Sequence, residues 1–182
     1  MKLNERKASM PNSVLSQVEM MNEFAPALAY GGKRYAKKTM VRARLAVEGE
    51  VIVTITGDGK ETQNTAKAGD YVVENQTAAK EQYIVTGTTF RKRYAPLSRE
   101  DAESTALFLH YKAIGKCIGI VYKGRVNTEN LSTLPVEIKF MASWNEEMVL
   151  KPGDMLVAPL PDTKSVYRIA AKEFEETYAE EL

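Results

Sequence analysis

Two segments of this chain share one frame of residues, and this repetition constrains the fold more than any other feature. The segments are KAGDYVVENQTAAKEQYIVTGTTFRKRY at 67–94 and KPGDMLVAPLPDTKSVYRIAAKEFEETY at 151–178, which align without a gap and agree at eight of 28 positions. Their period of 84 residues is far longer than that of a solenoid repeat, so we interpret them as duplicated small domains. The shared frame consists of Gly69, Asp70, Tyr83, Phe90 and Tyr94 in the first copy and of Gly153, Asp154, Tyr167, Phe174 and Tyr178 in the second.

Each copy has the pattern of a β-hairpin followed by a helical turn. Gly-Asp after Lys-Ala or Lys-Pro is turn chemistry, because glycine tolerates backbone angles closed to other residues and aspartate bonds back to nearby amides. The short segments YVV with QYIV, and MLV with VYRI, flank a polar loop and predict a hairpin. A Phe and a Tyr four residues apart then share one face of a helical turn. We expect these two aromatic side chains to cover the hairpin and close its core.

Further strand patterns precede each copy. TMVRARLAV and EVIVTIT alternate in the first half, and we expect Val51, Val53 and Ile55 to point inward. CIGIVYKG and VEIKFMASW supply the corresponding strands of the second half. The sequence therefore predicts an α+β fold of two small, mostly antiparallel β units related by duplication, each ending in a short helix.

Two helices are predicted outside the β units. SREDAESTALFLHYK begins with a capping-box-like Ser-x-x-Asp and has apolar residues at helical spacing, which predicts a linker helix. NSVLSQVEMMNEF carries an apolar stripe of Val14, Val18 and Met21, and Pro26 is expected to end that N-terminal helix. This helix either packs on the body or serves as an arm for a partner chain. The expected division is 1–32 for the N-terminal helix or arm, 33–97 for the first unit, 98–114 for the linker helix and 115–182 for the second unit.

The segment KRYAKKTMVRARLA and the first copy of the frame carry a family likeness. Together they resemble small bacterial and phage-encoded proteins with Tyr-x-Lys-Lys-Pro near the start, Pro-Gly-Asp-Tyr in the middle and a Tyr-then-Phe-x-x-x-Tyr ending. Thr39 and Ala68 replace the two prolines, and Met155 replaces the motif tyrosine in the second copy. The resemblance to this PGDY-type family, here in tandem, implies a small β-rich fold and a phage or mobile-element setting, but no activity. The matching residues are Tyr35, Lys37, Lys38, Gly69, Asp70, Tyr71, Tyr83, Phe90 and Tyr94.

Composition narrows the possible chemistry. The 182 residues have a net charge of +1, with 44% hydrophobic and 27% charged residues, which is ordinary for a globular protein. The start has no continuous apolar segment, and no stretch is long and apolar enough to span a membrane, so we expect a cytoplasmic protein. The single cysteine and single histidine exclude a disulfide and a Cys-rich or His-rich metal cage within the chain. AYGGKRY lacks the spacing of a phosphate-binding loop, and we expect no cofactor.

Candidate catalytic groups are few. His110 is the one histidine that could act as a general base, and a partly buried position on the linker helix is the alternative interpretation. Cys117 lies in an apolar segment that is typical of a core side chain. Asp70 and Asp154 occupy equivalent positions in the two segments and could act together in acid-base chemistry or could each cap a turn. The turn motif favours capping. We therefore assign no catalytic residue and lean away from an enzyme.

Positive charge gathers with tyrosine in the first half, where residues 1–97 contain 15 Lys and Arg against 10 Asp and Glu. KRYAKK, RAR and RKR form a footprint that nucleic acid or nucleotide phosphates could use. In the second copy two glutamates, Glu175 and Glu176, replace the first two residues of RKR, so the basic cluster is alternatively a lock between the units. Trp144 is expected half-buried at a strand end, with a pocket wall as the functional alternative. The candidate binding residues are Arg91, Lys92, Arg93, Lys37, Lys38 and Trp144.

Three hypotheses of function follow from these patterns. The first is a non-enzymatic binding or accessory protein, whose partner would be another protein or a second copy held through the N-terminal helix. The second is nucleic-acid or nucleotide-phosphate binding through the basic first half. The third is an enzyme with a carboxylate site between the units. The shared frame is interpreted as scaffold, so the residues that differ between the copies carry the functional interest.

Overall fold

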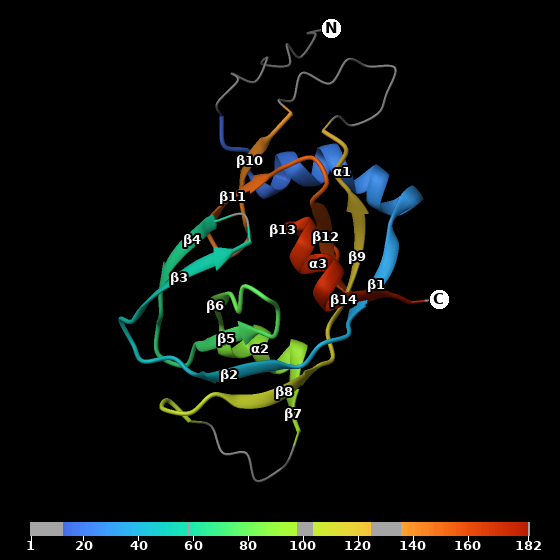
Figure 1. Cartoon of the computed structure of the whole chain (residues 1–182). Coiled ribbons are helices and arrows are strands. Elements are labelled where there is room, and N and C mark those ends of the chain that lie inside the picture. The colour runs from blue at the N-terminus through green and yellow to red at the C-terminus, as the bar shows by residue number, and fades with distance from the viewer. Residues whose placement is uncertain (1–12, 58, 98–103, 125–135, 182) are drawn as a thin grey trace, which may run out of the picture.

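The computed structural model describes residues 13–57, 59–97, 104–124 and 136–181. These residues form three helices and 14 strands, and the paired strands run antiparallel, which confirms the predicted α+β class. Figure 1 shows two sheets, one below the other, with the hairpin of β3 and β4 beside them. The helices are α1 (Gln17–Gly31), α2 (Gly87–Arg93) and α3 (Ala171–Thr177).

The two larger sheets have equivalent strand orders. The first sheet has the order β6-β5-β2-β8-β7, and the second sheet has the order β13-β12-β9-β1-β14. The first sheet consists of β2 (Val41–Leu45), β5 (Tyr71–Asn75), β6 (Gln82–Val85), β7 (Tyr94–Pro96) and β8 (Leu109–Ala113). The second sheet consists of β1 (Lys33–Lys37), β9 (Lys116–Val121), β12 (Met155–Leu160), β13 (Tyr167–Ile169) and β14 (Tyr178–Glu180).

The two aligned segments adopt the same local structure 84 residues apart. In the first hairpin Tyr71 pairs with Val85, and at the same offset in the second hairpin Met155 pairs with Ile169. Each hairpin leads directly into its helix, α2 or α3, and then into a short strand that begins at the last tyrosine of the frame. The hairpin and the helical turn that we predicted from each segment are therefore both present.

A Gly-Asp turn opens each hairpin. Gly69 and Gly153 have φ angles of +83° and +95°, in the left-handed region that favours glycine. The carboxylates of Asp70 and Asp154 each accept a hydrogen bond of 2.9 Å from the backbone amide three residues earlier. Both aspartates therefore close their own turns, as the capping interpretation requires.

The two halves of the chain exchange one strand each. β1 comes from the first half but lies in the second sheet between β9 and β14, where Tyr35 is opposite Cys117 on one side and Glu180 on the other. β8 follows the first unit in sequence and lies in the first sheet, between β2 and β7. The boundary expected at 97 therefore does not separate the two sheets, because β8 in the expected linker completes the first sheet, and β1 of the expected first unit belongs to the second sheet.

The linker helix expected over 98–114 is wrong where the structure describes it. Leu109–Ala113 is the strand β8, and 104–108 contains no helix, while 98–103 lies outside the described residues. Along β8 the buried Tyr111 alternates with exposed His110 and Lys112, which is the two-residue period of a strand. Apolar residues in this segment fit a helical spacing as well as the alternation of a strand. Pairing with β2 and β7 selects the strand.

α1 packs on the body of the protein, but through a different stripe from the predicted one. Met20, Phe24 and Leu28 are buried, four residues apart, whereas Val18 is 69% exposed. Ser16 and Glu19 form a capping box at the start of the helix. The expectation that Pro26 ends this helix is also wrong, because Pro26 lies inside α1. Proline in a helix removes one backbone hydrogen bond, and here the packing of three buried side chains outweighs that loss.

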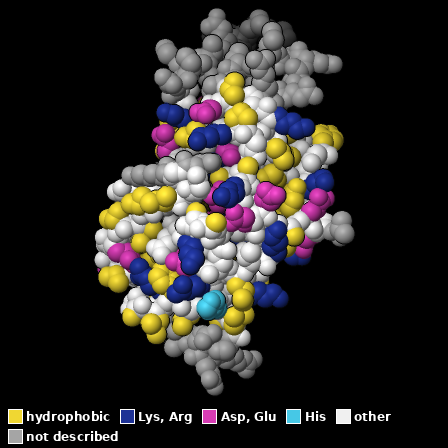
Figure 2. Space-filling model, in the orientation of Figure 1, with side chains coloured by type: hydrophobic (Ala, Val, Ile, Leu, Met, Phe, Trp, Pro, Cys, Tyr) yellow, Lys and Arg dark blue, Asp and Glu magenta, His cyan; other side chains and the backbone are white. Residues whose placement is uncertain are grey.

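The expected inward face of β3 (Val51–Thr56) is wrong. Val51, Val53 and Ile55 are 52%, 38% and 55% exposed, whereas Thr54 and Thr56 are buried. Alternation predicts that a strand has two faces, but it does not decide which face turns toward the protein. In Figure 2 the apolar side chains form a row of yellow atoms at the left edge, where β3 lies in Figure 1. The hairpin partner is β4 (Gly59–Thr65).

The apolar cores lie on the two sheets. On the first sheet Phe90 of α2 stacks on Tyr71, with ring centroids 3.9 Å apart, and meets Tyr111 of the exchanged strand edge to face. On the second sheet Phe174 of α3 stacks on Tyr178 at 4.8 Å. A separate core under α1 includes side chains of the hairpin β10 (Ile138–Met141) and β11 (Glu147–Leu150).

Candidate functional site

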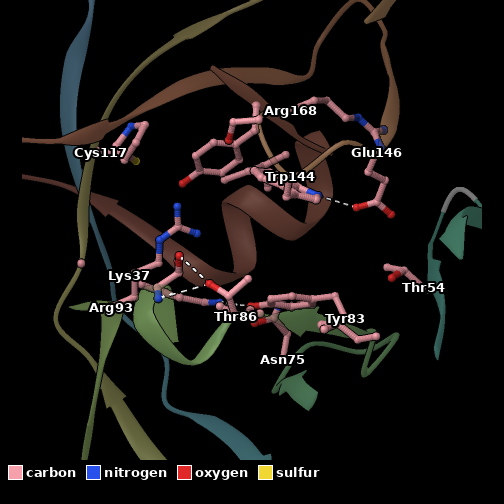
Figure 3. A pocket seen from close by; sticks show the side chains of 18 of the residues that line it. Lys37, Thr54, Asn75, Tyr83, Thr86, Arg93, Cys117, Trp144, Glu146 and Arg168 are labelled. Carbon is pink, nitrogen blue, oxygen red and sulfur yellow. Dashed lines mark hydrogen bonds between the residues drawn. The ribbon is translucent and has the colours of Figure 1, made fainter. Parts of the chain in front are cut away.

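A cavity of about 1080 Å³ lies between the two sheets. Its walls come from both sheets, from α2 and α3 and from the two hairpins, as Figure 3 shows from close by. The volume is at the upper end of the range for small-molecule sites, about 300–1,000 Å³. One wall of the cavity is formed where the chain passes from β8 to β9, and it includes Gly115 and Lys116. The strand exchange thus helps to build the cavity.

Lys37 lies in the cavity wall at the end of β1. Its Nζ donates a hydrogen bond to Asn75 Oδ1 and another, of 3.4 Å, to the hydroxyl of Tyr83. The same ammonium lies 5.8–5.9 Å from the ring centroids of Tyr83, Tyr94 and Tyr178, within the range of cation–π attraction. In the described part of the chain, no carboxylate forms an ion pair with it.

Arg93 reaches the same end of the cavity from the last residue of α2. Its backbone carbonyl accepts hydrogen bonds of 2.7 and 3.1 Å from the amides of Ile114 and Gly115. These bonds hold the end of α2 against the segment that joins β8 to β9. Its guanidinium carbon lies 5.4 Å from the ring centroid of Tyr167. Among the described residues the guanidinium has no carboxylate partner. We call Lys37, Arg93 and the tyrosines around them the basic end of the cavity.

Tyrosines from both copies of the frame meet at the basic end. Tyr83 and Tyr94 come from the first copy, Tyr167 and Tyr178 from the second, and the hydroxyls of Tyr83 and Tyr94 lie 3.1 Å apart. Burial raises the pKa of Tyr167 to about 12 and the pKa values of Tyr83 and Tyr178 well above their usual range. These three hydroxyls therefore stay protonated at neutral pH and are able to donate hydrogen bonds.

We expect Tyr167→Phe to flatten the loss of stability at alkaline pH. In the wild type the unfolded tyrosine releases its proton near pH 10, whereas the folded tyrosine keeps it to about pH 12. The unfolded state then binds fewer protons, so the free energy of unfolding falls as pH rises between these values, by about 1.4 kcal/mol per pH unit for this group. Urea unfolding between pH 8 and 11 measures the slope, with Tyr30→Phe, which alters a 95% exposed ring, as control. An unchanged slope in Tyr167→Phe would contradict the assignment.

The wall opposite the sheets' tyrosines is polar. β3 and β4 turn Thr54, Thr56, Thr62 and Asn64 toward the cavity. In Figure 3 Thr54 lies on the far side of the cavity from Lys37 and Arg93. The hairpin therefore presents hydroxyl and amide groups to the cavity and apolar side chains to solvent, which explains why its faces are reversed from the expected arrangement.

Two carboxylates on this side of the cavity each have one oxygen without a hydrogen-bond partner. Glu173 is 6% exposed; its Oε1 accepts a hydrogen bond of 2.9 Å from the Gly57 amide, and its Oε2 has no partner. Glu146 Oε2 accepts a hydrogen bond from Trp144 Nε1, and its Oε1 has no partner. Both glutamates line the cavity. Trp144 itself is 39% exposed in the turn between β10 and β11, forms part of the wall and lies edge to face with Tyr167.

The structure brings together four of the six candidate binding residues and leaves two outside. Lys38 Nζ donates a hydrogen bond of 2.8 Å to the carbonyl of Glu175, and Arg91 is exposed away from the cavity lining. The residues that line the cavity are Lys37, Lys92, Arg93 and Trp144.

The charge arrangement differs from the expected lock between RKR and the second-copy glutamates. In the described residues no ion pair joins these two groups. Instead, Glu176 accepts a hydrogen bond of 3.1 Å from the amide of Ala78, in the variable loop of the first copy. The contact between the copies therefore uses one of the glutamates, but with a backbone partner.

The RAR segment does not form a free basic patch. Arg44 makes a two-pronged ion pair with Glu50, with distances of 2.8 and 2.7 Å, and Arg42 lies 3.3 Å from Glu74. Figure 2 shows Lys and Arg interspersed with Asp and Glu over the displayed face. Among the described residues, Lys37 and Arg93 are cations of the cavity wall without an ion-pair partner.

The remaining chemical candidates lie as follows. His110 is exposed on β8 and does not line the cavity. Cys117 is 1% exposed, and burial raises the pKa of its thiol to about 12, so it is not a ready nucleophile. Asp154 forms a buried ion pair of 2.7 Å with Arg168, in addition to closing its turn. The described residues contain no group of three His, Cys, Asp or Glu residues placed to hold a metal ion.

Sequence reasoning missed several cavity residues, among them Asn75, Thr54 and Glu173. Asn75 lies in ENQTAAK, the segment that differs most clearly between the copies, and Glu173 is aligned with Thr89. Difference between the copies was therefore the signal that could have found both. Thr54 gave no such signal, because it was assigned to the wrong face of its strand.

No protein-family model, curated protein or solved structure matches the chain. The resemblance to PGDY-type proteins stays a prediction. Within the described residues, no helix has the length and apolar character needed to cross a membrane.

Proposed function

We propose that this is a binding protein that holds a small anionic molecule at the basic end of the cavity. The observation that carries the proposal is that Lys37 and Arg93 line one cavity, both partly buried and with no carboxylate partner among the described residues. A charge removed from water is costly unless another charge compensates it. An anion between the two cations supplies that compensation.

The surrounding groups fit an anion. A guanidinium donates two parallel hydrogen bonds to a phosphate or carboxylate, and an ammonium adds a second point of charge. The Tyr83 hydroxyl accepts a hydrogen bond of 3.4 Å from Lys37 Nζ and donates one of 3.3 Å to Asn75 Oδ1, so it helps to hold the ammonium in place. Nucleotide phosphates are anions of this kind. The proposal is therefore compatible with both the binding-protein hypothesis and the nucleotide-phosphate alternative.

Nucleic acid is less well supported than a small anion. A long polyanion requires an accessible basic track, and the arginines of RAR are paired with glutamates. The two cations of the cavity also come from separate elements, Lys37 from β1 in the second sheet and Arg93 from α2 beside the first sheet, which suits a compact ligand better than a continuous strand. The cytoplasm and a phage or mobile-element setting are proposed on the sequence alone.

Arg93→Gln is expected to weaken binding of inorganic pyrophosphate at least about tenfold in calorimetric titrations at low ionic strength, because a charge-assisted pair is lost. Arg91→Gln is the matched control, since it removes the same charge from the same helix but outside the cavity lining. Equal affinity in the two variants, or no binding of pyrophosphate by the wild type, would overturn the proposal.

A further inference from the structure

Glu173 is a second charged group of the same cavity that has no ion-pair partner in the part of the chain the structure describes, and its sign is opposite to that of the basic end. The residue is 6% exposed, and its Oε2 has no hydrogen-bond partner. A carboxylate oxygen in this position has lost water and gained no donor from the protein. Such a group points to a donor that arrives with a ligand.

Two hydrogen bonds hold Glu173 in place at the wall of the cavity. Its Oε1 is fixed by the Gly57 amide at 2.9 Å, which ties α3 to the tip of the β3–β4 hairpin. Its own backbone carbonyl accepts a hydrogen bond from the Thr177 hydroxyl within the helix. Glu173 therefore belongs to a rigid element of the cavity wall, as a binding site requires.

The positive and negative groups are separated across the cavity. Gly57 directly follows Thr56 of β3, so Glu173 lies on the hairpin side, and Figure 3 places Thr54 of that hairpin across the cavity from Lys37 and Arg93. In the described residues no ion pair joins Glu173 to either cation. The opposite charges are thus available at two ends of one space and do not neutralise each other by contact.

The other charged pair in the cavity wall is already compensated. Arg168 lines the cavity, but its side chain is 4% exposed and lies 2.7 Å from Asp154. It therefore contributes little net charge to a ligand. Glu146, whose Oε1 also has no partner, adds a second acceptor beside Trp144.

We infer that the ligand is a zwitterion, with its anionic group between Lys37 and Arg93 and an ammonium group on Glu173. This inference rests on the proposed anion-binding function and specifies the ligand of that same site. The ammonium donates to Glu173 Oε2 and compensates its buried charge, which a neutral hydroxyl would do only in part. The polar side chains of β3 and β4, Thr54 and Thr56 among them, offer hydrogen bonds along the way between the two ends.

Two matched series of compounds test the inference: ω-aminoalkyl phosphates with two to six methylene groups, and n-alkyl phosphates of the same lengths. Varying the length finds the span between the two ends. Calorimetric titration of the wild type is expected to show at least about a tenfold preference for the amino compound at the best length. Glu173→Gln is expected to remove that preference while retaining alkyl phosphate binding within about twofold.

Glu175→Gln serves as the control, because this exposed residue lies on the same helix and outside the cavity lining. It should keep the preference of the wild type. Thermal melting of each variant checks that the fold is intact. Equal binding of both series by the wild type, or a preference that survives in Glu173→Gln, would overturn the zwitterion and leave the anion site standing. If the wild type binds neither series, the proposed function fails, and the inference fails with it.

Discussion

Asp154→Asn is expected to destabilise the protein by about 3–5 kcal/mol, because it leaves a buried arginine without its counter-charge. The side chains of Arg168 and Asp154 are 4% and 5% exposed, and Arg168 Nε lies 2.7 Å from Asp154 Oδ2. Asp154 also accepts hydrogen bonds from the amides of Lys151 and Ala171. Urea unfolding at neutral pH measures the change in the free energy of unfolding.

The chain supplies a matched control for this substitution. Asp70 occupies the equivalent position and makes the same turn, but the residue aligned with Arg168 is Ile84. Asp70→Asn should therefore cost only about 1 kcal/mol, the value of one hydrogen bond. If both variants lose equal stability, the ion pair is not the source of the effect. Replacing Arg168 by Met in the Asp154→Asn background should restore part of the loss, because no unpaired charge then remains.

Phe90→Ala is expected to cost about 3–5 kcal/mol, as large-to-small changes of buried aromatic residues do. Phe90 is 2% exposed and stacks on Tyr71 with an interplanar angle of 7°. It also meets Tyr111 at 4.9 Å, so its loss leaves a hole beside a strand that belongs to the other half of the chain. Chemical denaturation with intrinsic fluorescence detection reports the change.

Two further variants separate cavity formation from a general effect of aromatic removal. Phe90→Leu keeps most of the side-chain volume and should lose clearly less stability than Phe90→Ala. Tyr30→Ala removes an aromatic ring that is 95% exposed and should stay within about 0.5 kcal/mol of the wild type. A loss of stability in Phe90→Ala no greater than that in Tyr30→Ala would show that the ring does not support the first sheet.

The local structure of the repeated segments could be predicted because neighbouring residues decide it. A glycine that needs a positive φ, an aspartate that caps its own turn and two short alternating strands act within about 20 residues of one another. The hairpins, the turns at Asp70 and Asp154 and the helices α2 and α3 follow from them. No distant partner had to be known.

The exchanged strands could not be predicted, because their partners are far away in sequence. β1 pairs Tyr35 with Cys117 and Glu180, and nothing in KRYAK identifies those partners. The same limit produced the false helix at 109–113, where an alternating pattern and a helical spacing coexisted. Pairing partners, and not local propensity, decided the outcome.

The cavity was only partly predictable for a related reason. Lys37, Arg93 and Trp144 were selected as candidates from their chemistry, and they line the cavity. Their convergence depends on how the halves pack, which residue type alone does not reveal. The motif tyrosines were interpreted as scaffold, yet Tyr83 and Tyr167 also form cavity walls beside the two cations.

The exchange of β1 and β8 also has a consequence for the order of folding during synthesis. β1 lies between β9 and β14, so this strand waits for one partner that begins at Lys116 and for another that ends at Glu180. The first sheet likewise cannot join β2 to β7 until β8 has been made. Pairings that span most of the chain close large loops and form late. The nascent chain therefore completes the first sheet once β8 has been made, whereas the second sheet keeps open strand edges until β14 has emerged.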